Sequence, residues 1–275
     1  EKALGHPIEV ISGIEEARLI YSGVSHSLPP NEGLRLVLDI GGGSTELILG
    51  RGDKPGALES LHMGCVLMTE QHFPNGELNR ANFDSARLAA RLKLRPVKAF
   101  FRESSGIEAV GTSGTINSTE AVALELGVIE SNDLTPDSVE TLIDRVIEFD
   151  NITDLQLRGL SERRSQVWPG GLAILVELMT VLRIERLKVS DGALREGLLY
   201  DLIGRLQHED ARERSVQAMA ARYHVDAAQA ERVAATAAYL YRQGIAVWSR
   251  DLALEAQLLD WAARLHEIGL DISHD

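Results

Sequence analysis

Hydrophobic positions along the chain fall into two repeating patterns. Five short, nearly continuous apolar runs predict strands, at residues 8–11, 34–40, 61–68, 107–110 and 186–189. A sixth run, at 45–49, follows the second so closely that the two predict a hairpin. Helical spacing recurs in four longer segments, at 83–101, 136–149, 172–182 and 194–206. Strands interleaved with helices in this order predict a mixed α/β domain.

The two ends of the chain carry different signals. Ser12 and Glu15 have the spacing of a capping box, which predicts a helix that runs through Tyr21. The polar residues 22–33 predict a linker, and from about His208 the pattern is helical only. We therefore expect three parts, residues 1–28, an α/β domain over 29–206 and an all-helical segment over 207–275.

Composition and charge narrow the possible functions. With 44% hydrophobic and 25% charged residues, the chain can bury a sizeable core. A formal net charge of −13 argues against nucleic acid and anionic membranes as partners, so an anionic substrate would need a local metal ion, backbone amides or arginines. The single cysteine, Cys65, excludes an intrachain disulfide, and no apolar run is long enough to span a membrane. We expect a soluble, cytoplasmic protein.

Residues 39–46 are the strongest candidate for chemistry. Asp39 ends a buried strand, and the polar and glycine positions after it are Gly41, Gly42, Gly43, Ser44, Thr45 and Glu46. Three glycines allow positive φ and a close approach, so that N–H groups can converge on phosphate oxygens. Asp39 beside that anion needs a cation, which suggests Mg²⁺ bound directly or through water. The alternative is an ordinary hairpin turn, but a charge directly after an apolar strand is costly without a partner.

A second loop has the composition of an anion site. Ser113, Gly114 and Thr115 lie between the strand at 107–110 and the helical run from Asn117, where a helix N-terminus can bind phosphate. Two such turns in one α/β domain suggest that both contact the same substrate.

Glu16 has two interpretations. Its neighbour Glu15 can close the capping box, which leaves Glu16 without a local role. A carboxylate in a first helical turn is favoured by the macrodipole alone, so only a family resemblance makes Glu16 a candidate general base.

The other polar motifs give weaker signals. Asp191 opens a helix after the strand at 186–189, where it either lines an active site or caps the helix. Arg163, Arg164 and Lys188 could contact an elongated polyanion, although such residues usually form a solvated face.

The C-terminal histidines invite a metal interpretation that we do not favour. His266 is followed by Glu267 rather than by the aspartate of an HD-type metal site. His274 and Asp275 have the right pairing but no visible partners. We expect a helical module without metal.

Four motifs together resemble the exopolyphosphatase and guanosine-pentaphosphate phosphohydrolase (Ppx/GppA) family. They are residues 8–20, 39–46, 111–115 and 190–197, in the family's order and at similar spacing. The similarity covers essentially the whole chain, and residues 265–270 look like those of the longer, exopolyphosphatase-type members. The resemblance implies an actin-like, Hsp70-like ATPase fold with ribonuclease-H-like lobes, followed by an HD-like helical domain.

The resemblance also implies an activity, hydrolysis of a terminal phosphoanhydride with Mg²⁺ by in-line attack of water. In it, Glu16 resembles the base that activates the water, Asp39 and Glu46 resemble the acidic metal-site residues, and residues 41–45 resemble the phosphate loop. A homodimer is implied as well, and K⁺ as an activator stays undecided. Family members begin with an Asp-x-Gly-Ser-type loop that does not precede Asp39 here, so this chain alone could lack activity.

Several functions stay open. We favour inorganic polyphosphate as the substrate, because the helical C-terminal segment could extend a long-chain channel, with guanosine pentaphosphate as the alternative. A nucleotide-binding module of the actin or Hsp70 kind and a catalytically silent alarmone sensor are the non-enzymatic alternatives. Glu16 argues against the first, and Glu16 with Asp39 and Glu46 argues against the second.

Overall fold

A six-stranded sheet organises residues 1–200, the first of two compact units into which the chain divides; the second is residues 201–275. The computed structural model describes residues 5, 10–101, 107–206, 211–244 and 252–268. The strands are β1 (Leu34–Ile40), β2 (Thr45–Arg51), β3 (Lys54–Leu61), β4 (Glu108–Thr112), β5 (Asp133–Leu134) and β6 (Leu187–Val189). They lie in the order β3, β2, β1, β4, β6, β5. The first three form an antiparallel meander, β4 and β6 continue the sheet parallel to β1, and β5 is antiparallel to β6.

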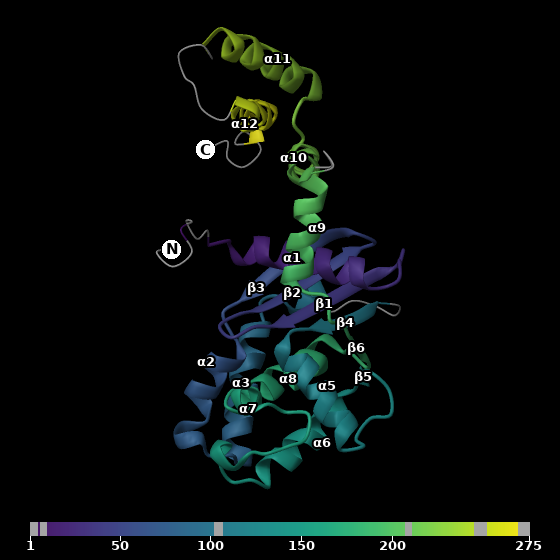
Figure 1. Ribbon diagram of the computed structural model, residues 1–275, viewed down its shortest axis with the longest axis vertical. Helices are drawn as coiled ribbons and strands as arrows, with labels where there is room; N and C mark the ends of the chain where they lie inside the picture. Colours follow the sequence, from purple (N-terminus) through teal and green to yellow (C-terminus); the bar gives the residue numbers. More distant parts are fainter. Residues whose placement is uncertain (1–4, 6–9, 102–106, 207–210, 245–251, 269–275) are drawn as a thin grey trace. The chain divides into compact units, whose positions relative to one another are not determined.

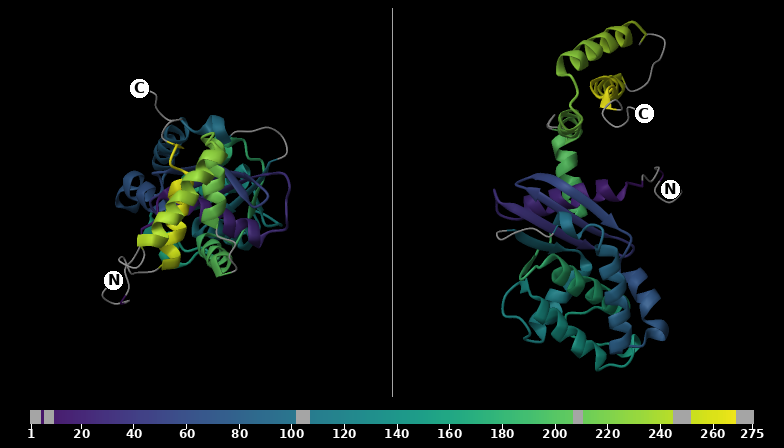
Figure 2. Two further views of the ribbon diagram at one scale, coloured as in Figure 1. Left: turned by 90° about the horizontal axis from the view of Figure 1, so that it is seen from above. Right: turned by 180° about the vertical axis from the view of Figure 1, so that it is seen from behind.

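Helices cover both faces of this sheet (Figure 1). One face is covered by α1 (Gly13–Ser27), and the other carries the larger core around α8 (Trp168–Leu182), which is buried on nearly every side. The view from behind shows the sheet between these two layers (Figure 2). The remaining helices of this part are α2 (Cys65–His72), α3 (Arg80–Leu94), α4 (Lys98–Phe101), α5 (Gly114–Glu125), α6 (Pro136–Ile147) and α7 (Glu162–Ser165), with 3₁₀ turns at Pro74–Gly76 and Ile152–Asp154. The helix α9 (Leu194–Leu206) begins in the first unit, and its residues from Asp201 belong to the second.

Alternation along β1 and β2 decides which face carries the candidate carboxylates. Leu36, Leu38 and Ile40 belong to the larger core, whereas Val37 packs with Ile48 against α1. Successive side chains of a strand point to opposite faces. Asp39 and Glu46 therefore lie on the same face as Val37 and Ile48, under α1.

The second unit is helical in its described residues. It contains α10 (Ala211–Arg222), α11 (Ala227–Gly244) and α12 (Leu252–Arg264), and α11 packs against α12 (Figure 2, left). Arg264 binds Glu231 at 2.8 Å, and the indole of Trp261 donates to Glu213 at 2.6 Å, so α12 is tied to both other helices. In the parts of the chain that the structure describes, no helix combines the length and the apolar character that crossing a bilayer requires.

Most of the predicted elements are present. The hairpin at 34–49, the strands near 107–110 and 186–189, and the helices near 136–149, 172–182 and 194–206 are confirmed. The helix predicted from Asn117 begins three residues earlier, at Gly114. Part of the strand predicted at 8–11 lies outside the described residues, and Val10 and Ile11 are not in a strand. The division into 1–28, 29–206 and 207–275 stays a prediction.

Three predicted elements are wrong, each for a physical reason. Of the strand predicted at 61–68, only Leu61 is in a strand, as the last residue of β3. The helix α2 begins at Cys65, where the backbone N–H groups of Cys65 and Val66 donate to carbonyls of the 41–44 loop. The helix at 83–101 is two helices, since Pro96 has no N–H to continue the first. The linker at 22–33 starts late, because α1 continues to Ser27 and ends before Pro29.

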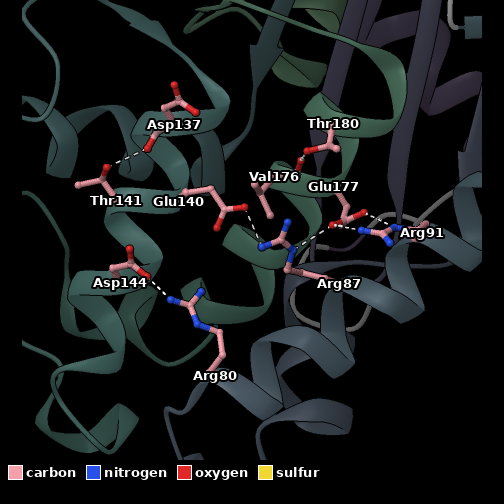
Figure 3. A network of polar contacts seen from close by, with 10 residues as sticks. All are labelled: Arg80, Arg87, Arg91, Asp137, Glu140, Thr141, Asp144, Val176, Glu177 and Thr180. Atoms are coloured by element: carbon pink, nitrogen blue, oxygen red, sulfur yellow. Dashed lines mark hydrogen bonds and ion pairs between the residues drawn. The ribbon is translucent and has the colours of Figure 1, made fainter.

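A buried ion-pair network joins three helices on the core side of the sheet (Figure 3). Glu177 of α8 is fully buried, and its carboxylate accepts from Arg87 and Arg91 of α3, each Nε at 2.9 Å. Arg87 also pairs with Glu140 of α6 at 2.7 Å. A carboxylate inside a core is tolerated only when it is paired and hydrogen-bonded, so the network fixes how α3 and α6 pack on α8.

We expect Glu177→Ala to lower the free energy of unfolding by about 3 kcal/mol, because it leaves the largely buried Arg87 guanidinium with one partner fewer. Arg91→Ala is the matched control. Arg91 binds the same carboxylate but is 56% exposed, and its removal should cost less than about 1 kcal/mol. Urea unfolding measures both variants. Equal losses would show that burial does not control this network.

Candidate active site

Two buried carboxylates face each other at one edge of the sheet. Asp39, near the end of β1, is the register partner of Glu46 on β2 and of Thr112 on β4. Asp39 is 8% exposed and Glu46 is 1% exposed. Both point to the α1 face, so the antiparallel hairpin by itself brings them together.

The helix α1 adds a third carboxylate, Glu16. Gly13, its first residue, rests on the hydroxyl of Ser60, in space that a Cβ would need. Ser60 is the register partner of Glu46 and donates to its carboxylate at 2.8 Å. Glu16 lies in the first turn of the helix and is partly exposed, and its charge acts on both buried carboxylates.

Glu15 does not close the predicted capping box. The Ser12 hydroxyl accepts from the backbone N–H of Glu15, as predicted, but the Glu15 carboxylate accepts from Arg18 at 2.8 and 2.9 Å. Of the two adjacent carboxylates, only Glu16 acts on the buried pair.

Burial and mutual repulsion make these carboxyls weak acids. Burial raises the pKa of Asp39 to about 8, and the charges of Glu46 and Glu16 add to the shift. Burial also raises the pKa of Glu46, although hydrogen bonds from Ser44 and Ser60 oppose the change. At neutral pH and without a cation, Asp39 is therefore mostly protonated.

The loop after Asp39 has a fixed backbone and an open outer side. The N–H of Gly41 donates to the carbonyl of Ser44, and the carbonyls of Gly41 and Gly42 accept from the first amides of α2. None of the three glycines takes positive φ, contrary to prediction. Gly42 and Gly43 are exposed, and a Cβ on Gly43 would stand in open space, where a ligand can approach the backbone.

The glycine that close packing requires is Gly64, which the sequence did not single out. A Cβ there would collide with the backbone of Gly42 and Gly43. Gly64 thus lets the start of α2 lie directly behind the loop.

The second loop lies beside the first, at the end of the neighbouring strand. Ser113 takes φ +106°, a strained value for a residue with a side chain, and α5 begins at Gly114. The hydroxyl of Thr115 is buried and donates to the carbonyl of Ile40 at 3.4 Å, while that of Thr45 is buried and donates to Met63 at 2.6 Å. These two hydroxyls are used in holding the loops in place. The groups that remain for contact with an anion are backbone amides and the hydroxyls of Ser44 and Ser113.

Arg164 is the cation nearest to the second loop. The Arg164 guanidinium fills the space that a Cβ on Gly114 would take, and Arg164 is exposed to solvent. Within the described residues it forms no ion pair, so its charge is available to an anion at the start of α5.

The donor set fits a hard cation. Among the residues that the structure describes, no three His, Cys, Asp or Glu side chains converge closely enough to hold a metal ion alone. Mg²⁺ usually keeps several waters and binds one or two carboxylates together with substrate phosphates. Asp39 and Glu46 suffice for the protein's part of such a site.

Comparison with known proteins identifies the family. The Ppx/GppA phosphatase family model matches residues 1–206, and the model for domain III of Ppx/GppA phosphatases matches residues 211–275. The chain belongs to the Ppx/GppA phosphatase family. This confirms the resemblance that the four sequence motifs indicate.

Two curated Ppx/GppA relatives bear the name guanosine-5′-triphosphate,3′-diphosphate pyrophosphatase. The protein from Vibrio cholerae serotype O1 is 42% identical over 270 residues, which are 98% of this chain and 54% of the relative. The protein from Aeromonas hydrophila is 41% identical over 274 residues, 100% of this chain and 55% of the relative. The chain thus spans about half the length of these relatives.

Solved Ppx/GppA structures have the same fold. The Aquifex aeolicus PPX-GPPA enzyme matches with a TM-score of 0.61 and 30% identity, over 72% of this chain and 66% of that one. An exopolyphosphatase from Cytophaga hutchinsonii matches with a TM-score of 0.64 at 21% identity, over 73% and 67% of the two chains, and shows the fold alone. The predicted fold class, an actin-like α/β lobe followed by a helical region, is confirmed.

We expect Asp39→Asn to stabilise the protein in a pH-dependent way. The carboxyl ionises near pH 4 in the unfolded chain but near pH 8 in the folded one. Its favourable contribution is therefore complete below about pH 4 and is lost as the pH rises to about 8, whereas asparagine does not ionise. The gain in melting temperature should be larger at pH 8 than at pH 5.

Calorimetry in buffer with a chelator measures this difference. Asp84→Asn, at an exposed position on α3, is the control and should show no such trend. The same gain for Asp39→Asn at both pH values would contradict the assigned pKa.

Proposed function

We propose that this chain is the catalytic part of a guanosine pentaphosphate 5′-phosphohydrolase, which removes the terminal phosphate of guanosine 5′-triphosphate 3′-diphosphate. The observation that carries the proposal is the group of three carboxylates, Glu16, Asp39 and Glu46, beside two loops suited to phosphate. The curated relatives named for this substrate support guanosine pentaphosphate over the polyphosphate that the sequence favoured.

In the proposed reaction Glu16 is the general base. It lies at the exposed side of the carboxylate group, where water can reach it, and it takes a proton from the attacking water. The water oxygen forms a bond to the terminal phosphorus as the bond from that phosphorus to the bridging oxygen breaks. The bridging oxygen keeps the electron pair and stays on the guanosine bis(diphosphate) product, and the terminal phosphate is released as inorganic phosphate. Catalysis of phosphoryl transfer depends mainly on positioning the water and the substrate and on stabilising the charge of the phosphate oxygens, so the proposed reaction needs no covalent nucleophile.

The other residues hold the substrate. Asp39 and Glu46 would hold Mg²⁺, which supplies positive charge to the phosphate oxygens when bound. The backbone of Gly42 and Gly43 and the first turn of α5 would bind phosphate oxygens, with Arg164 adding a fixed positive charge. A homodimer, activation by K⁺ and a cytoplasmic location stay predictions.

Inorganic polyphosphate is the second candidate substrate. It ends in the same phosphoanhydride, so the three carboxylates and both loops would act on it in the same way. The relation to the Cytophaga hutchinsonii exopolyphosphatase is too distant to favour it.

We expect Mg²⁺-dependent phosphate release from guanosine pentaphosphate, with Glu16→Gln lowering kcat by about 100-fold or more because the water loses its base. The assay uses this chain alone and an extended protein, in which the chain is completed with the parts of the Vibrio cholerae relative that it does not cover. Glu15→Gln is the matched control and should keep its activity, since Glu15 pairs with Arg18. Turnover of polyphosphate only would replace the proposed substrate, and binding without any turnover would indicate a sensor.

We expect Arg164→Gln to raise KM for both substrates by about 10-fold, since it removes a charge-assisted hydrogen bond to phosphate. The exposed neighbour Arg163 offers the control, and Arg163→Gln should leave KM unchanged. Steady-state kinetics on the extended protein measures both. An unchanged KM for Arg164→Gln would remove this residue from the proposed site.

A further inference from the structure

The turn between β6 and α9 is fastened to the end of β4, beside the second loop. The N–H of Ser190 donates to the carbonyl of Gly111 at 2.9 Å, and the hydroxyl of Thr112 donates to the carbonyl of Gly192 at 2.9 Å. Asp191 lies between these two anchors, and its carboxylate accepts from the side-chain amide of Asn117 on α5 at 3.2 Å. The position of Asp191 is therefore set by the same strand that carries the second loop.

The carboxylate of Asp191 has no role in capping α9. The N–H of Ala193 donates to Glu196 at 2.9 Å, and the N–H of Gly192 donates to the hydroxyl of Ser190 at 3.2 Å. Asp191 is exposed, and within the described residues no lysine or arginine pairs with it. The buried side-chain oxygen of Asn117 also has no hydrogen-bond partner. Local structure therefore assigns no role to two acceptors, the carboxylate of Asp191 and the side-chain oxygen of Asn117.

The carboxyl ends of the parallel strands β1, β4 and β6 place three polar residues in a row. Asp39 marks the end of β1, Ser113 follows β4 and Asp191 follows β6, and these strands are neighbours. At the usual strand spacing, Asp39 and Asp191 are two steps apart, about 10 Å. A substrate with its terminal phosphate at Asp39 and its inner phosphates at the start of α5 would bring its far end to Asp191.

The negative charge around Asp191 indicates which chemical group of the substrate can lie there. Asp191 and its partly buried neighbour Glu120 form a negative surface, which would repel a further phosphate. A carboxylate accepts hydrogen bonds and cannot donate them, so it selects a group with N–H donors. Guanine presents two adjacent donors, the ring N1–H and the exocyclic amine, that match the two oxygens of one carboxylate. Adenine presents an acceptor at N1 instead.

We propose that Asp191, held by Asn117, recognises the guanine edge of the substrate and rejects a longer phosphate chain. The inference rests on the proposed function, because it takes the direction of the substrate from the phosphate site. Asp191 is a specificity-determining residue that contacts the base and takes no part in the reaction itself.

The test compares guanosine pentaphosphate with its inosine counterpart, which lacks the exocyclic amine. The wild-type extended protein should prefer guanosine in kcat/KM by about 10-fold or more, the effect of one hydrogen bond to a charged group. In Asp191→Asn that ratio should fall to near one, while polyphosphate turnover stays the same or rises. Glu120→Gln is the control; it removes a neighbouring charge and should keep the preference for guanine.

Binding separates the two possible failures. Calorimetry with guanosine 3′,5′-bis(diphosphate) and its inosine counterpart reports base preference without any turnover. A wild-type preference that survives in Asp191→Asn, with an unchanged melting temperature, would overturn the role of Asp191 and leave the proposed function intact. Base preference that depends on Asp191 without hydrolysis of either nucleotide would remove the proposed function and keep this inference.

Discussion

The burial of two neighbouring carboxyl groups is the constraint on which the site at the end of β1 depends. Glu16, Asp39 and Glu46 come from a helix and two strands, and two of them are buried together. The fold tolerates this arrangement because Asp39 is mostly protonated at neutral pH when no cation is bound, so the two buried groups are not both charged. Register fixes Asp39 opposite Glu46, Ser60 binds Glu46, and the contact of Gly13 with Ser60 fixes the start of α1. A cation bound there would favour the ionised form of both groups, because it would offset the cost of burying their charge.

The sequence predicts the parts of this edge that follow from local rules. Apolar runs bounded by glycine predict the hairpin. The charge of Asp39 near the end of a buried strand predicts that this residue belongs to a site. Helix spacing finds the elements that pack on the larger core, because burial there is continuous along α8. The resemblance of four motifs then gives the family, and the role proposed for Glu16 comes from that resemblance because no local pattern could assign it.

What the sequence misses depends on contacts between distant residues. The apolar run at 61–68 has no periodicity that distinguishes a strand from a helix. Most of it is not a strand because the first N–H groups of α2 donate to carbonyls of the 41–44 loop, which is distant in sequence. Three consecutive glycines suggested positive φ, which none of them takes. At this loop the close approach depends on Gly64, which lies against it only in the folded chain. The sequence names Arg164 together with Arg163 and Lys188, and only the contact with Gly114 in the folded chain distinguishes it from those two.

The contact between Gly13 and Ser60 limits how the spacing of the three carboxylates can vary. One hydroxyl touches both the helix that carries Glu16 and the carboxylate of Glu46. A helix can change register against a sheet only in steps set by its own geometry, about 5.4 Å for a full turn. Such a step would move Glu16 away from Asp39 and Glu46. The spacing between Glu16 and the two buried carboxyl groups therefore depends on how α1 packs on β3, and side-chain exchanges can adjust it without any sliding of the helix.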